Sequence, residues 1–402
     1  MEQLKKLKEE VEQELKGNIL PYWMKFIPDR EYGGFHGHVT HFNQPVEKAN
    51  KGAVLNARIL WTFAAAYGMY EDQAYLDTAK RAYDYILNQF VDREHGGVYW
   101  ELDYLGGVTA SRKQIYALAY TIYAMAEYHW ATGEEEALST AITLFQEIET
   151  NAFDKERNGY TEAFTRDWNP VEDLRLSKKD DNESKTMNTH LHIMEAYANL
   201  YRVWKDPRLK IALENIIMLF LDRFVDPETY HLNLFFDDDW NLKSNLISYG
   251  HDIECSWLLH EAAEVLGKQE LIEQTGQIAI NMARQSFKGL DKDGGLFYEM
   301  FPLENRVDSD KHWWPQAETV VGYFNAYQLS GDREFARKTL GSWEFIRDKI
   351  VDRQHGEWYW SVNRDGVPQT EKEKAGFWKC PYHNGRACME MIRRIEKKLI
   401  ND

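Results

Sequence analysis

The sequence predicts an all-α fold, an (α/α)6 barrel in which six pairs of helices close into a ring and short β-hairpins lie in the loops. The first observation behind this prediction is an acidic turn, followed by glycine and an aromatic residue, that recurs about six times. Its interval of roughly 60 to 70 residues leaves room for two helices and a short hairpin in each unit. The second observation is that a single helix stands at each end of the chain.

The recurring turn separates one helical pair from the next. It opens on an aspartate and in most copies leads through glycine into an aromatic residue. The copies are Asp29–Phe35, Asp92–Tyr99, Asp154–Tyr160, Asp226–Tyr230, Asp293–Phe297 and Asp352–Gly356.

The two ends of the chain predict that the repeat closes. Residues 2–24 form one amphipathic helix before the first turn, and residues 382–399 form one helix after the last turn. Each end is therefore half of a pair, and docking of the two halves would complete a ring, which an open solenoid does not require. No linker rich in Pro, Ser or Gly interrupts the chain, so we expect residues 1–402 to be a single catalytic domain.

The hydrophobic pattern distinguishes inner from outer helices. Residues 56–70 are apolar nearly all round, as expected for a helix packed on both sides, whereas residues 71–89 carry the one-sided stripe of an outer helix. Further inner helices are predicted at 116–131, 188–204, 251–266, 317–329 and 384–399, and further outer helices at 134–148, 206–224, 269–286 and 332–350.

One long segment, residues 167–185, is polar, contains proline and lacks periodicity. These properties predict a loop that flanks one mouth of the barrel. Long loops in such positions often shape a binding site.

Charge and cysteine content exclude several classes of partner. The formal net charge of -17 disfavours nucleic acid and anionic membranes, because their phosphates would be repelled. Three cysteines without CxxC spacing indicate free thiols in a reducing compartment. The first residues lack the apolar core of a signal peptide and no apolar run could span a membrane, so we expect a cytoplasmic protein. The oligomeric state is left open.

Aromatic residues form an unusually large share of the chain, with 14 Trp, 23 Tyr and 19 Phe. Most must belong to the core. Several tryptophans, however, stand beside polar groups near the starts of inner helices, namely Trp313, Trp314 and Trp378. An aromatic face against a pyranose ring, with polar groups around it, is a common way to bind sugars, so the predicted ligand is a carbohydrate.

Polar residues occupy comparable places near the starts of the inner helices, and a closed ring would bring them together at one end of its axis. The residues are Arg58, Tyr116, Asn188, His192, His251, Glu254, Trp314, Glu318 and His383. Asn188 and His192 share one helix face, as do His251 and Glu254. A histidine paired with a carboxylate suits a general base.

Each residue also has an ordinary structural interpretation. A single histidine is more often a core or surface residue than a catalytic one, and Arg58 could belong to a structural ion pair. His190 and His192 could be metal ligands, but residues two apart on a helix point in different directions and a third ligand at a familiar spacing is missing. We therefore predict no metal and no cofactor. The hypothesis of a catalytic site rests on the expectation that polar residues from six repeats converge at one end of the ring.

Five sequence segments resemble the N-acylglucosamine 2-epimerase superfamily, and within it the cellobiose 2-epimerases. They are residues 52–61 (GAVLNARILW), 185–192 (KTMNTHLH), 248–254 (SYGHDIE), 313–318 (WWPQAE) and 378–386 (WKCPYHNGR). The resemblance covers essentially the whole chain. It implies metal-independent epimerisation at C2 of the reducing-end glucose of β-1,4-linked disaccharides, such as cellobiose, lactose and mannobiose, through a cis-enediol.

The resemblance also implies a role for each matching residue. His251 and His383 would be the two acid/base residues, with Glu254 polarising His251, and Arg58 would stabilise the enediolate oxygen. Tyr116, Asn188 and His192 would bind hydroxyl groups and assist ring opening, and Trp314 and Trp378 would stack on the sugar. Glu318 matches a site residue whose role is less defined.

Three alternatives remain at this point. A mannose isomerase or a monosaccharide or N-acylglucosamine 2-epimerase of the same superfamily would share the chemistry. A glycoside hydrolase would use paired carboxylates, for which Asp252 with Glu254 or Glu318 are candidates. A non-catalytic sugar-binding protein would have no need of the histidines. The preferred disaccharide and any isomerisation to a ketose are left open.

Overall fold

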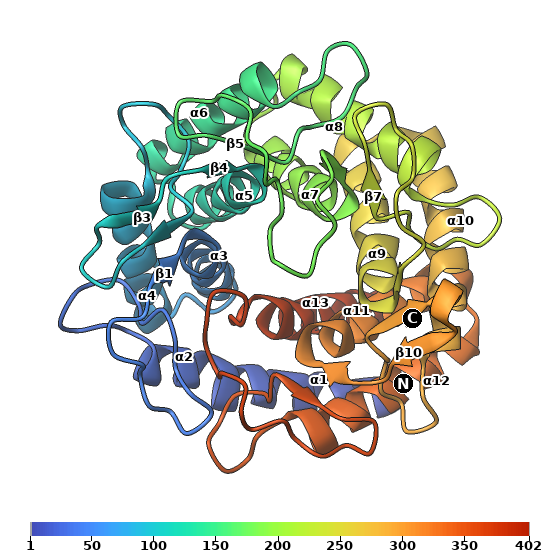
Figure 1. Cartoon of the computed structure of the whole chain (residues 1–402). Coiled ribbons are helices and arrows are strands. Elements are labelled where there is room, and N and C mark those ends of the chain that lie inside the picture. Colours follow the sequence, from blue (N-terminus) through green and yellow to red (C-terminus); the bar gives the residue numbers. More distant parts are fainter. Residues whose placement is uncertain (1, 402) are drawn as a thin grey trace.

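The computed structural model describes residues 2–401, and the side chains of residues 2–400. It is a ring of helices in two concentric layers (Figure 1). This arrangement confirms the predicted all-α (α/α)6 barrel with short hairpins in its loops. The search for membrane-spanning helices, which covered the described residues, finds none that is long and apolar enough.

The inner layer consists of helices that are buried along most of their length. In α3, for example, every residue from Ala53 to Ala66 is buried, which explains why the sequence is apolar all round. The inner helices are α3 (Ala53–Tyr70), α5 (Ile115–Thr132), α7 (Met187–Val203), α9 (Tyr249–Leu266), α11 (Trp313–Ser330) and α13 (Tyr382–Asn401).

The outer layer packs one apolar face against the inner one. Its helices are α1 (Glu2–Glu14) with α2 (Leu20–Phe26), α4 (Gln73–Tyr85), α6 (Glu135–Asn151), α8 (Pro207–Leu219), α10 (Gln269–Gln285) and α12 (Arg333–Phe345). Several continue into a single π-helical turn: η1 (Leu15–Ile19), η2 (Ile86–Phe90), η3 (Phe220–Phe224) and η6 (Ile346–Ile350).

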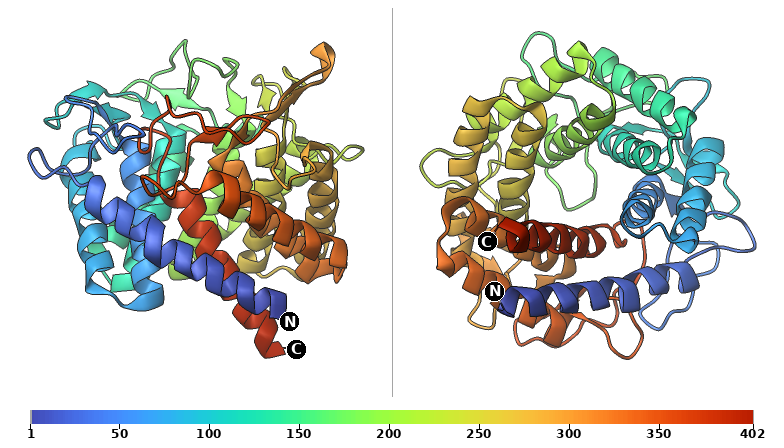
Figure 2. Two further views of the ribbon diagram at one scale, coloured as in Figure 1. Left: turned by 90° about the horizontal axis from the view of Figure 1, so that it is seen from below. Right: turned by 180° about the vertical axis from the view of Figure 1, so that it is seen from behind.

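The ring closes as the two half-pairs at the chain ends predict. Helix α13 packs against the inner helices α3 and α11, and α1 lies along its outer side. Figure 2 shows the first and last helices side by side, with both ends of the chain at the face opposite the loops. The inner helices begin one to four residues earlier than their predicted starts, with the largest differences in α3, at Ala53, and in α11, at Trp313. In α11 the periodicity was interrupted by Pro315, which the first turn tolerates because its N–H groups have no partner within the helix.

Short strands line the end of the barrel where the inner helices begin. A two-residue strand precedes most inner helices and pairs with a strand of the next repeat. The pairs are β1 (Lys51–Gly52) with β2 (Glu101–Leu102), β4 (Lys113–Gln114) with β5 (Ala163–Phe164), β6 (Lys185–Thr186) with β7 (Phe235–Phe236), β8 (Ile247–Ser248) with β9 (Glu299–Phe301), and β11 (Lys311–His312) with β12 (Ser361–Val362). Two hairpins add β3 (Val108–Ala110) to β2 and β10 (Arg306–Asp308) to β9.

The recurring acidic turn anchors these strands through buried ion pairs. The carboxylate of Asp92, for instance, lies 2.8 Å from the ammonium of Lys113, and both side chains are fully buried. Equivalent pairs join Asp29 to Lys51, Asp154 to Lys185 and Asp291 to Lys311. Each of these lysines precedes an inner helix by two residues, so the pair fixes where that helix starts.

The fifth copy of the turn differs from its predicted position. Its backbone bond runs from the Asp291 N–H to the Gly295 carbonyl, as the turn at Asp92 bonds to Gly97, so Asp291 rather than Asp293 opens it. Asp293 is an additional partner of Lys311, at 2.7 Å. The prediction was wrong because this turn is one residue shorter than the turn at Asp92.

Candidate active site

A cavity of about 880 Å³ opens at the end of the barrel where the inner helices begin. Apart from Glu318, each residue proposed from the sequence contributes to its wall: Arg58, Tyr116, Asn188, His192, His251, Glu254, Trp314, Trp378 and His383. They come from all six repeats, so closure of the ring is what brings them together. The volume lies in the range of pockets that enclose small organic ligands.

Arg58 is held in a fixed position in the cavity wall. Its Nη2 donates hydrogen bonds of 2.8 Å to the hydroxyls of Tyr116 and Tyr120, and its Nη1 donates to the Trp378 carbonyl at 3.3 Å. The guanidinium also lies 4.2 Å from the centre of the Tyr120 ring. Arg58 is thus a preorganised positive charge among neutral partners, available to an oxygen that gains charge.

Two histidines face the cavity from α9 and α13, with Trp314 in contact with both. The centre of a Trp314 ring lies 4.8 Å from that of His251 and 5.5 Å from that of His383. Nδ1 of His251 lies 2.7 Å from the Ser248 hydroxyl, and Nδ1 of His383 lies 2.6 Å from Oε1 of Glu318. Nδ1 of His383 donates its hydrogen to the Glu318 carboxylate. In the neutral ring, Nε2 is therefore the nitrogen that can accept a proton.

Both histidines are neutral at pH 7. Burial is the main cause that lowers the pKa of His251 well below its usual value, and His192 and Lys179 add to this effect. Burial also lowers the pKa of His383 well below the usual range, reinforced by the charges of Arg58 and Arg386. A neutral imidazole can accept a proton, as a general base must.

Arg386 connects three buried carboxylates beneath the cavity. Its Nη2 donates to Oε1 of Glu254 at 2.9 Å and to Oε1 of Glu318 at 2.7 Å, and its Nη1 donates to Glu195. Burial raises the pKa of Glu254 and of Glu318. In Glu195 burial acts in the same direction, but Arg386 and the bond from His192 outweigh it and lower the pKa to about 2.

The predicted pairing of Glu254 with His251 is wrong. The carboxylate of Glu254 instead accepts a hydrogen bond from Arg386 and lies 3.8 Å from Nδ1 of His383, while the partner of His251 is Ser248. The two residues do lie on one face of α9. The guanidinium of Arg386, on α13, is a stronger partner for Glu254 than His251 is. Its position could not be derived from the spacing of residues within α9.

Glu318 and His192 occupy different layers of the site. Glu318 lies behind His383, where it also accepts a bond from the Trp257 indole at 3.0 Å, so it supports the histidine and does not line the cavity. His192 lines the cavity, and its Nδ1 lies 2.9 Å from Oε2 of Glu195. Glu195 and Arg386 were missed in the sequence, although each stands three residues after a proposed histidine, a spacing that places both on one helix face.

The loop at residues 167–185 flanks the mouth of the cavity, as predicted, with residues 175–181 in its wall. The hairpin of β9 and β10 approaches from the other side and was not anticipated (Figure 2). The two segments meet where Lys179 donates a 2.5 Å hydrogen bond to the Tyr298 hydroxyl. Tyr298 in turn stacks on His312, with ring centres 3.9 Å apart.

The grouping of His, Asp and Glu side chains raises the question of a metal site. His190 is turned away from the cavity, since Nδ1 bonds to the Thr186 carbonyl and Nε2 accepts from the Tyr160 N–H. Glu254, Glu318 and His383 lie close enough together to bind a cation. The guanidinium of Arg386 already supplies positive charge to both of these carboxylates.

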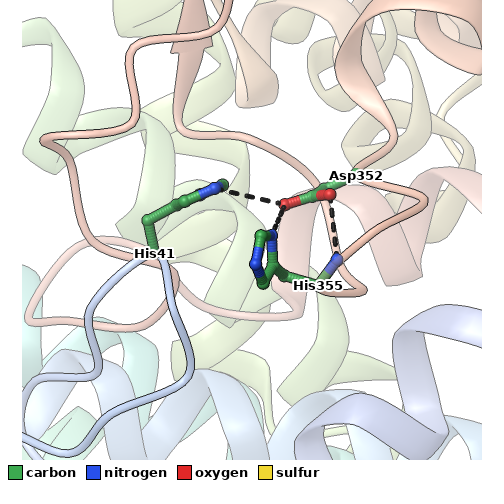
Figure 3. Close-up of side chains that lie close together, drawn as sticks. All are labelled: His41, Asp352 and His355. Carbon is green, nitrogen blue, oxygen red and sulfur yellow. Dashed lines mark hydrogen bonds and ion pairs between the residues drawn. The ribbon is translucent and has the colours of Figure 1, made fainter.

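A second group that could bind a cation lies outside the cavity and consists of His41, Asp352 and His355 (Figure 3). Nε2 of His41 lies 3.7 Å from Oδ2 of Asp352, and Nδ1 of His355 lies 3.5 Å from the same oxygen. The ammonium of Lys374 is closer to the same oxygen, at 2.7 Å. The group therefore repeats the aspartate–lysine pair of the other turns.

The cavity and its residues can be compared with known proteins. The family model of N-acylglucosamine 2-epimerase (GlcNAc 2-epimerase) matches residues 33–387. The chain belongs to the N-acylglucosamine 2-epimerase family. Among curated members of this family, the cellobiose 2-epimerase of Bacteroides fragilis is 51% identical over 96% of this chain and 98% of its own length.

Solved structures of epimerases and isomerases share the fold. The structure of cellobiose 2-epimerase from Bacillus thermoamylovorans B4167 superposes with a TM-score of 0.92 at 40% identity, covering 97% of this chain and 100% of that one. A D-mannose isomerase structure superposes with a TM-score of 0.83 at 20% identity, covering 95% and 97%. At this lower identity the likeness concerns the fold alone.

Proposed function

We propose that this chain is a cellobiose 2-epimerase, which interconverts glucose and mannose at the reducing end of β-1,4-linked disaccharides. The observation that carries the proposal is the pair of neutral histidines, His251 and His383, on the wall of one cavity with the fixed cation of Arg58. The relatedness to cellobiose 2-epimerases over nearly the whole chain supports the choice of substrate.

The chemistry requires removal of a weakly acidic proton. Once the sugar ring is open, the proton at C2 lies next to an aldehyde, and its loss gives a cis-enediol in which negative charge develops on the aldehyde oxygen. A base must take the proton, and a cation or donor must stabilise the oxygen. Return of a proton to the opposite face of the planar intermediate gives the other epimer.

The residues of the cavity divide these tasks. His251 and His383 would act as base and acid on opposite faces of C2, each changing role with the direction of the reaction. Arg58 would stabilise the enediolate oxygen, and Tyr116, Asn188 and His192 would bind hydroxyls and assist ring opening. Trp314 and Trp378 would stack on the sugar. Glu318 would orient His383 through its 2.6 Å bond to Nδ1, and Glu254 would contribute its charge from 3.8 Å away.

The direct test is incubation of the purified protein with cellobiose, with the products resolved by NMR. We expect 4-O-β-D-glucosyl-D-mannose to appear and to revert to cellobiose when supplied alone. Parallel incubations with glucose, mannose and N-acetylglucosamine distinguish the runner-up, a mannose isomerase or monosaccharide or N-acylglucosamine 2-epimerase. Turnover of these sugars without turnover of cellobiose would overturn the proposed substrate.

A glycoside hydrolase is disfavoured by the position of Asp252. Its carboxylate accepts the Leu232 N–H at 2.8 Å and lies 2.7 Å from Nδ1 of His231, in a buried location away from the cavity wall. The pair that the sequence suggested, Asp252 with Glu254 or Glu318, therefore does not flank the cavity as a hydrolase would require. Release of free glucose from cellobiose in the same incubation would favour hydrolysis instead.

The cysteines support a reducing compartment as the place of action. Cys255, Cys380 and Cys388 are all buried free thiols, as is usual for proteins of the cytoplasm. We therefore propose a cytoplasmic enzyme that acts on free disaccharides.

We expect Arg58→Ala to lower kcat/KM for cellobiose by about a hundredfold or more, because a preorganised charge beside the developing oxyanion is lost. Initial rates measured by NMR or coupled assay check this. Arg93→Ala serves as a control, since this arginine is exposed and does not line the cavity. A near-normal rate for Arg58→Ala with an intact fold would contradict the assigned role.

We expect epimerisation to continue unchanged after dialysis against EDTA. The reason is that Arg386 supplies the positive charge that Glu254 and Glu318 require, and the chemistry needs only proton transfer. The measurement is the initial rate before and after dialysis and after addition of Mg²⁺, Mn²⁺ or Zn²⁺. Activity lost with EDTA and restored by one of these ions would show that this expectation is wrong.

We expect kcat/KM to stay constant as the pH falls through 6.5 and to decline only at lower pH. A depressed pKa means that each histidine remains neutral below the usual titration range, so the base is lost only when the pH passes the lowered value. A pH–rate profile checks this, because kcat/KM reports ionisations of the free enzyme. An acidic limb centred at 6.5 or above would contradict the burial argument.

A further inference from the structure

The inner helix that carries His251 is attached to the barrel differently from the others. In four repeats a buried lysine, two residues before the inner helix, pairs with an aspartate of the acidic turn. In the last repeat Lys379, three residues before α13, pairs with Glu357, and both side chains are buried. Before α9 the corresponding position of the strand is Ile247, so this helix begins without a lysine pair.

A second contact attaches three of the inner helices, namely α7, α9 and α11. The fourth residue of the helix accepts the backbone N–H of a residue at the end of the acidic turn. The bonds run from Tyr160 to His190 at 2.9 Å, from Leu232 to Asp252 at 2.8 Å and from Leu296 to Gln316 at 2.7 Å. Burial lowers the pKa of His190 to about 4, so the acceptors on α7 and α11 are uncharged, whereas the acceptor on α9 is a carboxyl group.

The carboxylate of Asp252 makes a further contact, with His231. Nδ1 of His231 lies 2.7 Å from Oδ2 of Asp252, while Oδ1 accepts the Leu232 N–H. Asp252 is fully buried and His231 is 7% exposed. The two oxygens therefore join α9 to two consecutive residues after the acidic turn, in the one repeat whose inner helix has no lysine before it.

This attachment bears directly on His251. His251 is the third residue of α9 and Asp252 is the fourth, so a contact that holds Asp252 also holds the backbone beneath the imidazole. Nδ1 of His251 lies 2.7 Å from the hydroxyl of Ser248, the residue before the helix. The wall of the active cavity includes His251 and Ser248 but is formed without Asp252 and His231, so any effect of this pair on the sugar must pass through His251.

We propose that Asp252, together with His231, is a positioning residue that holds the first turn of α9 and so keeps the His251 imidazole in place for proton transfer at C2. The inference rests on the proposed function, in which His251 is one of two acid/base groups. A displacement of about 1 Å between reacting groups can cost about a hundredfold in rate. His383 lies on α13, which has its own buried lysine pair, so loss of the Asp252 contacts should affect only one of the two histidines.

The test compares Asp252→Leu with Asp252→Asn in the full chain. Leucine is similar in size to aspartate but accepts no hydrogen bond, so it releases both Leu232 and His231. Asparagine keeps an oxygen for the Leu232 N–H, and its amide can donate to His231 in the other tautomer. Thr275→Val is the matched control, because it removes a buried partner, at 3.2 Å, from Nδ1 of His260 in the later half of the same helix.

Backbone hydrogen exchange, followed by mass spectrometry, measures the attachment independently of any activity. In Asp252→Leu we expect peptides covering residues 253–258 to exchange about tenfold faster than in the parent protein, because two contacts that hold the start of α9 are lost. Peptides of α13 should be unaffected, and Asp252→Asn and Thr275→Val should resemble the parent at residues 253–258. Unchanged exchange at these residues in Asp252→Leu would overturn the proposal, whether or not the parent turns over cellobiose.

Exchange of the C2 proton in heavy water measures the effect on His251. We expect Asp252→Leu to slow exchange of the same epimer, cellobiose or glucosyl-mannose, that His251→Ala fails to exchange, by on the order of a hundredfold. Exchange of the other epimer should persist, and Asp252→Asn and Thr275→Val should exchange both.

Two results of the C2 measurement would overturn the proposal. Equal loss for both epimers in Asp252→Leu would show general damage to the site, and full exchange of both would show that His251 needs no such support. If the parent protein itself neither epimerised nor exchanged cellobiose, the proposed function would fail, and with it the catalytic part of this inference. The backbone exchange would still decide whether Asp252 holds the start of α9.

Discussion

Replacement of either His251 or His383 by alanine is expected to abolish epimerisation. Inversion at C2 through a planar enediol needs protons on two faces, and one fixed imidazole cannot reach both. The general acid or base lost in each variant contributes about a hundredfold to ten-thousandfold to the rate. The measurement is the initial rate with cellobiose, with His95→Ala as a matched control, since His95 is an exposed histidine away from the cavity.

Hydrogen exchange separates the two histidines. In heavy water, a variant that keeps one base is expected to exchange the C2 proton of one epimer without forming the other, and the two variants should differ in which epimer exchanges. NMR of the C2 proton of cellobiose and of glucosyl-mannose measures this directly. If either alanine variant kept most of its epimerase activity, a single-base mechanism would replace the proposed one.

Replacement of Arg386 by glutamine is expected to lower the free energy of unfolding by about 3 to 5 kcal/mol, because buried carboxylates lose their cation. Glu195, Glu254 and Glu318 all depend on this one guanidinium. Chemical denaturation of the parent and the variant gives the difference. Activity should fall as well, since both His192 and His383 are oriented by carboxylates of this group.

The control for Arg386→Gln is Arg284→Gln. Arg284 pairs with Asp332 at 2.8 Å, but both side chains are more than one third exposed, so its loss should cost at most about 1 kcal/mol. A comparable loss of stability in the two variants would show that burial of the Arg386 network has no special energetic weight.

The layout of the barrel could be predicted because helical periodicity and the acidic turn are local signals. Inner helices such as α3 are apolar all round because both sides are buried, and this property is visible in the sequence alone. The boundaries were less predictable. Glu71, for example, reads as helical but adopts a left-handed conformation that ends α3, and α4 begins only after Asp72 caps it.

The candidate site could be predicted where residues lie near the starts of their inner helices, as His251 and His383 do in α9 and α13. Its partners could not, because they depend on contacts between distant segments. Arg386 and Glu254 are 132 positions apart in the chain, and nothing in the spacing of either helix shows that they meet. The hairpin at the mouth was missed for the same reason: its role depends on Lys179, from the loop on the other side.

The closure of the ring also determines where the protein can be attached to other materials. Helices α1 and α13 lie side by side, and their free ends point away from the loops that surround the active cavity (Figure 2). A fusion partner or a solid support joined to either end would thus leave the mouth facing solution. Because the two ends are neighbours, a short linker between them should permit circular permutation, with new ends in an exposed loop.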